Sequence, residues 1–238
     1  MLRVLVTRPE PGASRTARKL EEMGFEPLLL PLTETMALPV DAKAIPEDVA
    51  AVAITSANAV RHAPRDLIAV LSKLPCHAVG RRTAEAARKA GFLSVNEGPG
   101  DAEALADGMA IAFSGKTIVY LCGRVRFPAF EQKLEAAHAQ AHAVETYDTL
   151  AVSYSDEAIL PLISGQSVDV VLLYSAMAAA EMQTLARRLT LQQAFEKTRF
   201  FALSARIAAA FGGGTGKAMH VAARPDEEAL LALLRARP

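Results

Sequence analysis

The chain contains an internal repeat, and this repeat constrains the fold more than any single motif does. Four segments of the first half recur in the second half in the same order: residues 4–9 as 118–124, 53–60 as 172–179, 78–84 as 202–208, and 101–105 as 226–230. A repeat of this kind indicates one structural unit that occurs twice. It predicts two similar half-chains with a ligand cleft between them.

Short apolar runs alternate with longer amphipathic stretches, which is the pattern of strands joined by crossover helices. The 51% of hydrophobic residues include few aromatics, which suits helices packed on parallel strands. The expected fold class is therefore α/β, with two similar doubly wound domains whose parallel sheets have five strands each. The predicted strands are residues 3–7, 26–31, 51–55, 76–79, 93–96, 117–121, 142–146, 169–174, 199–203 and 218–222.

Two segments, 31–37 and 146–154, do not fit this alternation, and we expect them to be extended connectors. If they lie side by side, the chain leaves one domain early, builds the second domain and returns to complete the first. The predicted organisation is a first domain of residues 1–33 plus 154–238, a second domain of residues 38–146, and a two-stranded linker of residues 34–37 and 147–153.

Charge and cysteine content exclude several classes of protein. The chain has 26 basic and 26 acidic residues and a formal net charge of zero, so we expect neither a nucleic-acid nor a membrane partner. Only Cys76 and Cys122 are present, and His138 and His142 lack a third ligand, so neither a disulfide scaffold nor a metal site is expected. The sequence starts directly with a predicted strand and contains no long apolar run, which predicts a soluble, cytoplasmic protein.

Candidate ligand-binding residues follow the predicted strands, because ligands of open parallel sheets bind beyond the carboxyl ends of the strands. Turns into helices leave free backbone N–H groups there, which suit a carboxylate or a phosphate. Simple helix capping is the alternative explanation for each turn. The candidates are Arg8, Thr55, Ser56, Ala57, Asn58, Gly80, Thr83, Gly123, Ser175, Ala176 and Ser204.

Three of these candidates carry a more specific expectation. Gly80 would let the backbone approach a ligand closely, and Thr83 would donate its hydroxyl. For Arg8, two alternatives stay open: the side chain points into the cleft, or it is exposed beside a proline turn.

Four motifs together give the chain a family resemblance. It carries Val-Thr-Arg-Pro at 6–9, Ile-Thr-Ser-Ala-Asn-Ala-Val at 54–60, Ala-Val-Gly-Arg-Arg-Thr-Ala at 78–84 and Glu-Thr-Tyr-Asp-Thr at 145–149. Each motif is common by itself, but their order and spacing over the whole chain resemble uroporphyrinogen-III synthase. Ile207 stands where the family often has threonine, and Met177 replaces the polar residue found at Asn58, so we expect the two halves to hold a ligand unequally.

The resemblance implies an enzyme of tetrapyrrole biosynthesis that acts without a metal or an organic cofactor. Such an enzyme dehydrates and cyclises linear hydroxymethylbilane and inverts the last pyrrole ring, which gives uroporphyrinogen III. The resemblance also implies that Tyr147 donates a hydrogen bond or a proton to the departing hydroxyl, while a linker residue packed against one lobe is the alternative for Tyr147. We expect a monomer. The competing function is a two-lobed small-molecule binding protein without catalysis.

Overall fold

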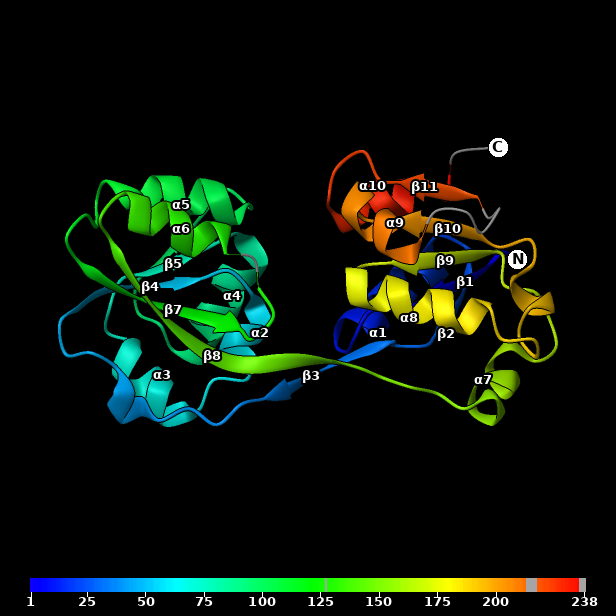
Figure 1. Ribbon diagram of the computed structural model, residues 1–238, viewed down its shortest axis with the longest axis horizontal. Helices are drawn as coiled ribbons and strands as arrows, with labels where there is room; N and C mark the ends of the chain where they lie inside the picture. Colours follow the sequence, from blue (N-terminus) through cyan, green and yellow to red (C-terminus); the bar gives the residue numbers. More distant parts are fainter. Residues whose placement is uncertain (127, 213–217, 236–238) are drawn as a thin grey trace. The chain divides into compact units, whose positions relative to one another are not determined.

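The chain divides into two compact units in the computed structural model, which describes residues 1–126, 128–212 and 218–235 (Figure 1). Unit 1 comprises Met1–Glu34 and the chain from Leu150 onward, and unit 2 comprises Thr35–Thr149. No helix in these described segments is long and apolar enough to cross a bilayer.

The described strands of unit 1 form one parallel sheet in the order β11-β10-β9-β1-β2. Alternate residues of the central strands point to opposite faces, so Leu5 and Val171 join the core under α7, α8 and α9, while Val4 and Val170 join the core under α1 and α10. The elements are β1 (Arg3–Val6), α1 (Gly12–Glu22), β2 (Glu26–Leu29), α7 (Asp156–Ile163), β9 (Val170–Leu173), α8 (Ala176–Ala186), η2 (Gln193–Phe195), β10 (Arg199–Ala202), α9 (Ala205–Phe211), β11 (Met219–Val221) and α10 (Glu227–Ala232).

The described strands of unit 2 form a sheet in the order β3-β8-β7-β4-β5-β6. Helices again cover both faces: Val52 and Ile54 pack with α2, α3 and α4, whereas Ala53 and Tyr120 pack with α5 and α6. The elements are β3 (Thr33–Ala37), η1 (Ala42–Ala44), β4 (Val49–Ile54), α2 (Ala57–Arg61), α3 (Arg65–Leu71), β5 (Cys76–Ala78), α4 (Arg81–Ala90), β6 (Val95–Glu97), α5 (Ala102–Ala110), β7 (Thr117–Gly123), α6 (Ala129–Ala136) and β8 (Gln140–Ala151).

The sequence repeat reappears as a repeat of topology. The order β6-β5-β4-β7-β8 in unit 2 matches the order β11-β10-β9-β1-β2 in unit 1, and every pair of neighbours in both series is parallel. The first half of the chain supplies β1 and β2 to one sheet and β4, β5 and β6 to the other. The two repeated half-chains are therefore not the two spatial units, because each half contributes strands to both.

The predicted fold class is confirmed, with one addition at the connectors. Leu38 N–H donates to Thr146 O at 2.9 Å and Val152 N–H donates to Leu32 O at 3.0 Å, so the two connecting segments run antiparallel. They form β3 and the second half of β8, which makes unit 2 a sheet of six described strands instead of the five predicted. The sequence pattern predicted only residues 142–146 of β8 as a strand. The buried positions of its second half include Thr146 and Asp148, which are polar and therefore do not give the pattern of an apolar strand.

Candidate active site

Each unit has one place where its strand order changes direction. In unit 2 the chain proceeds from β4 towards β5 and from β7 towards β8, so the switch lies between β4 and β7. In unit 1 the switch lies between β9 and β1. Ligands of open parallel sheets bind at such a point, outside the carboxyl ends of the strands.

Four predicted residues meet at the switch point of unit 2. Thr55 and Ser56 follow β4, Gly123 ends the neighbouring strand β7, and Tyr147 of β8 is the register partner of Gly123. The Tyr147 hydroxyl donates to Ser56 Oγ at 3.1 Å. The structure thus places Tyr147 in contact with Ser56 and Gly123, two of the candidates that follow or end a predicted strand.

The Tyr147 ring is held by a close fit. A Cβ atom at Gly123 would lie 2.6 Å from Tyr147 Cζ, so only glycine leaves room for the ring here. His62 stacks against the ring with centroids 5.8 Å apart and an interplanar angle of 27°. Tyr147 therefore has a defined position within unit 2.

Burial sets the protonation of two tyrosines at this point. It raises the pKa of Tyr147, with the Ser56 hydrogen bond acting in the opposite direction, so the phenol stays protonated at neutral pH. Burial likewise raises the pKa of Tyr120 to about 12. The Tyr120 hydroxyl and Thr55 Oγ1 are hydrogen-bonded at 2.8 Å, which fixes the residue next to Ser56.

Helix capping is part of the role of Ser56. Its Oγ accepts a hydrogen bond from the Asn58 backbone N–H at 3.2 Å, and Ala57 begins the short helix α2. Asn58 Oδ1 accepts from Arg61 Nη1 at 2.9 Å. Ser56 Oγ therefore accepts from both Asn58 and Tyr147, and no acceptor for its own hydroxyl proton is found among the described residues.

Gly80 lies beside this group, because β5 is the neighbour of β4 and Val79 N–H donates to Ile54 O at 2.8 Å. Gly80 caps α4 and packs against Gly100, whose Cα would be 3.1 Å from an added Cβ. Thr83 lies in the first turn of α4 and is only 5% exposed. Its side chain is thus almost fully buried.

The other predicted residues lie at the carboxyl ends of the strands of unit 1, with Arg8 and Ser175 at its switch point. Arg8 follows β1, Ser175 caps α8 after β9 with Ala176 as its first residue, and Ser204 caps α9 after β10. Ser175 Oγ accepts from Ala178 N–H at 3.1 Å, so capping is its observed contact. The candidates therefore form two groups, one in each unit.

Sequence reasoning missed four side chains that contact these groups: Tyr120, His62, Tyr174 and Glu227. A signal existed for Tyr174, because it precedes Ser175 in the repeated segment just as Thr55 precedes Ser56. None existed for His62, whose contacts depend on the linker strands: its Nε2 is hydrogen-bonded to Thr35 Oγ1 at 2.9 Å.

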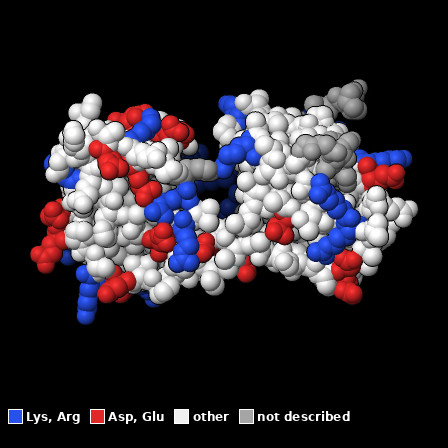
Figure 2. All heavy atoms as spheres, in the orientation of Figure 1, with Lys and Arg blue, Asp and Glu red and all other residues white. Residues whose placement is uncertain are grey.

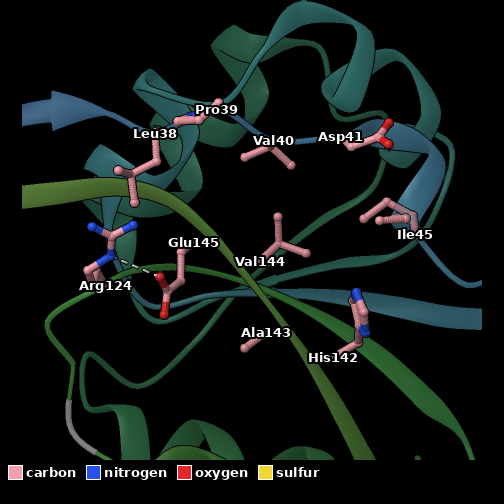
Figure 3. A pocket seen from close by; sticks show the side chains of 11 residues that line it. Leu38, Pro39, Val40, Asp41, Ile45, Arg124, His142, Ala143, Val144 and Glu145 are labelled. Atoms are coloured by element: carbon pink, nitrogen blue, oxygen red, sulfur yellow. Dashed lines mark hydrogen bonds and ion pairs between the residues drawn. The ribbon is translucent and has the colours of Figure 1, made fainter.

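A pocket of about 360 Å³ opens elsewhere in unit 2, and none of the predicted residues lines it (Figure 3). The chain after β3 forms one wall and β8 the other, with Arg124 at one end. Arg124 Nε and Glu145 Oε2 form an ion pair at 3.3 Å there. The lining residues are Leu38, Pro39, Val40, Asp41, Ala44, Ile45, Arg124, His142, Ala143, Val144 and Glu145.

Charged side chains of both signs are interspersed on the visible face of each unit, as expected for a chain with a net charge of zero (Figure 2). Within the described segments, no three His, Cys, Asp or Glu side chains come together as metal ligands. His138 follows α6 with φ 60° and His142 lies in β8, so their spacing is not that of one helix.

We expect acid to weaken unit 2 through His62. Burial, and next the charge of Arg61, lower its pKa below the ordinary value of 6.5, while the contacts of its ring are with Tyr147 and Thr35. The unfolded chain then binds a proton more readily than the folded one, so stability is lost as the pH falls below about 6.5. Urea unfolding at pH 7.5 and 5.5 measures this loss.

The control for His62 is His62→Phe, which keeps an aromatic ring without a titrating group. His77, whose pKa burial also lowers, is replaced by phenylalanine in both proteins so that its titration does not contribute. The variant should lose less stability between the two pH values. An equal loss with and without His62 would contradict this account.

Comparisons with known proteins agree with the observed fold. The family model described as uroporphyrinogen-III synthase HemD matches residues 14–232. A solved uroporphyrinogen-III synthetase from Helicobacter pylori is similar with a TM-score of 0.69 at 16% identity, over 99% of both chains. A mutant uroporphyrinogen III synthase from the extremely thermophilic bacterium Thermus thermophilus has a TM-score of 0.56 at 20% identity, over 99% of this chain and 98% of that one.

At these identities the two structures show a shared fold, and the family model carries the assignment. No curated protein sequence matches the chain significantly. The family match extends over nearly the whole chain, from α1 to the end of α10. The chain belongs to the uroporphyrinogen-III synthase family.

Proposed function

We propose that this chain converts linear hydroxymethylbilane into uroporphyrinogen III. The observation that carries the proposal is the family match over residues 14–232. The hydrogen-bonded Tyr147 and Ser56 at a sheet switch point support it, because this is where an α/β protein binds its ligand. The enzyme is a lyase of tetrapyrrole biosynthesis that eliminates water and closes the ring.

The first step needs a hydrogen-bond donor for the departing hydroxyl. The pyrrole nitrogen lone pair expels this hydroxyl, which takes up a proton from the solvent and leaves as water, and an azafulvene cation remains; the proton lost after ring closure returns to the solvent. Among the described residues the Ser56 hydroxyl proton has no acceptor, and Tyr147 polarises this hydroxyl by donating to Ser56 Oγ. Tyr147 and Ser56 thus act as one donor pair.

The second step selects the product. The substituted carbon of the last ring attacks the cation, a spiro intermediate forms, and its rearrangement inverts this ring before a proton is lost. The linear substrate also closes spontaneously without inversion. Each tenfold preference for the inverted product corresponds to about 1.4 kcal/mol of differential transition-state stabilisation.

The substrate carries eight carboxylates, and helix N-termini suit them despite the zero net charge of the chain. The caps of α4 and α8, at Gly80 and Ser175, supply such N-termini in unit 2 and unit 1 respectively. In the same proposal the domains comprise residues 1–33 plus 154–238 and residues 38–146, and the protein is a cytoplasmic monomer.

Tyr147→Phe should slow formation of the type III product by roughly tenfold without abolishing it. The change removes one hydrogen bond in the donor pair, worth about 1.4 kcal/mol, but leaves the ring against Gly123 and His62. Initial rates of type III formation measure the effect. A wild-type rate in this variant would remove Tyr147 from the mechanism.

The matched control is His138→Asn. His138 adopts a left-handed backbone conformation, which asparagine tolerates, and it contacts none of the proposed site residues. Its variant should retain the wild-type rate.

The proposed function itself is tested by the isomer of the product. Type III product should form in proportion to the amount of protein added to freshly generated hydroxymethylbilane.

A further inference from the structure

Unit 1 contains a buried carboxylate that holds two cations. Glu227 is 9% exposed and lies at the start of α10. Its Oε1 accepts from Arg8 Nη1 at 2.8 Å and from the Thr16 hydroxyl at 2.6 Å, while its Oε2 accepts from Lys19 Nζ at 2.5 Å. One carboxylate cannot neutralise two cations, so Glu227, Arg8 and Lys19 together carry a net positive charge.

Arg8 is the more tightly held of the two cations. Its guanidinium lies over the Tyr174 ring, 4.5 Å from the centroid, and its side chain is 19% exposed. A Cβ atom at Gly12 would lie 2.5 Å from Arg8 Nε, so the side chain passes directly over this glycine. The guanidinium is thus fixed by Glu227 at its Nη1, by an aromatic ring and by a glycine.

This arrangement leaves part of the guanidinium available. Nη1 is occupied by Glu227, with Thr16 Oγ1 at 3.5 Å. Nε lies over Gly12, and the hydrogen bonds of the guanidinium to described residues all use Nη1, which leaves Nη2; the buried Tyr174 hydroxyl lies beside Arg8 and Thr16 without a hydrogen bond of good geometry to a described residue. A planar guanidinium with free N–H groups suits a carboxylate.

The position of Arg8 makes this availability relevant to the substrate. Arg8 follows β1 and Tyr174 follows β9, the two strands that flank the switch point of unit 1. Tyr174 is followed at once by Ser175, the cap of the eleven-residue helix α8. In unit 2 the positions equivalent to Tyr174 and Ser175 are Thr55 and Ser56, so the guanidinium lies at the switch point of unit 1, as the candidate residues of unit 2 lie at theirs.

We infer that Glu227 is a positioning residue for substrate binding, which acts by holding Arg8 over Tyr174 so that Arg8 receives one carboxylate of the tetrapyrrole. This rests on the proposed function for the identity of the substrate. Glu227 does not touch the substrate; it orients the group that does. Lys19 supplies the second cation, which keeps the cluster positive after Glu227 has paired with Arg8.

A purely structural role for Glu227 makes a different prediction. If Glu227 only ties α10 to α1 through Thr16 and Lys19, its loss lowers stability and leaves ligand affinity unchanged. The two roles separate in a double-mutant cycle, because a residue that acts through Arg8 has no effect on affinity once Arg8 is gone.

The experiment compares wild type, Glu227→Gln, Arg8→Gln and the double variant. Equilibrium affinity for the octacarboxylate uroporphyrin III is measured by fluorescence, and KM and kcat are measured with hydroxymethylbilane. Each single variant should weaken binding and raise KM by about tenfold with kcat within about twofold. The double variant should bind no more weakly than Arg8→Gln alone.

Two further variants keep the result interpretable. Glu228→Gln changes the exposed neighbouring carboxylate and should leave affinity unchanged. Tyr174→Phe keeps the ring under Arg8 and should retain affinity, whereas Tyr174→Leu should lose several-fold. Additive losses in the cycle, or wild-type affinity in a folded Glu227→Gln protein, would overturn the inference.

The assays also separate this inference from the proposed function. If the wild-type protein forms type III product but the losses of affinity in the double-mutant cycle are additive, only the proposed role of Glu227 is refuted. A wild-type protein that forms only type I product refutes the proposed function. In that case the uroporphyrin affinities still decide whether Glu227 holds Arg8 for a polycarboxylate.

Discussion

Replacing Gly123 by valine should reduce the rate of type III formation by at least about a hundredfold. The added Cβ would lie 2.6 Å from Tyr147 Cζ and 3.0 Å from both Cε atoms, so the ring has to leave its place on β7. The displaced ring would separate from Ser56 and enter the edge where the substrate is proposed to bind. Overpacking at this buried strand end should also lower the free energy of unfolding by about 1–3 kcal/mol.

A second substitution that removes the Tyr147 ring tests whether the clash with this ring causes the effect of Gly123→Val. Gly123→Val combined with Tyr147→Ala should recover most of the lost stability and should have the rate of Tyr147→Ala alone. Gly108→Ala serves as the control, because no atom lies within 4 Å of a Cβ added at this exposed helical glycine. Near-wild-type activity of Gly123→Val would show that the ring position does not matter for the reaction.

Phe200→Ala should lower the stability of unit 1 by about 3–5 kcal/mol. Phe200 is fully buried in β10 and its ring lies 4.4 Å from that of Phe211. The hydrophobic clusters of the described residues each draw their side chains from a single unit. We therefore expect the loss to appear in amide hydrogen exchange of β1 and β9, with little change in β4 and β7.

Leu121→Ala gives the reciprocal experiment in unit 2, since Leu121 is fully buried in its core. It should reduce protection in β4 and β7 and leave β1 and β9 unchanged. Leu189→Ala, at a residue 87% exposed, should change stability by less than about 0.5 kcal/mol. Equal loss of protection in both sheets after either core substitution would contradict separate cores.

Much of the fold could be predicted because its signals are local. Strand-length apolar runs such as residues 170–173 are buried on both faces, and turns such as Thr55-Ser56 follow them directly. The repeat predicted that one topology occurs twice. The pairing of the two connectors was also predicted, but the addition of β3 to the sheet of unit 2 was not, because β3 is largely polar and exposed and is held by backbone hydrogen bonds.

In the candidate site, too, the residues could be predicted from local sequence, but the contacts between them could not. The turn residues could be found because each follows its own strand. The contacts that position them join residues far apart in the sequence: Tyr147 with Ser56, Tyr120 with Thr55, and Arg8 with Glu227. Such pairs depend on which strands become neighbours, which hydrophobic periodicity does not reveal.

The most direct test of the proposed function is the isomer composition of the product. Purified protein is mixed with freshly generated hydroxymethylbilane, the products are oxidised, and type I and type III uroporphyrins are separated by chromatography. A protein-free reaction and Gly123→Val run alongside. The account predicts predominantly type III with the wild-type protein and predominantly type I in both controls; only type I with the wild-type protein, matching the protein-free reaction, would contradict it.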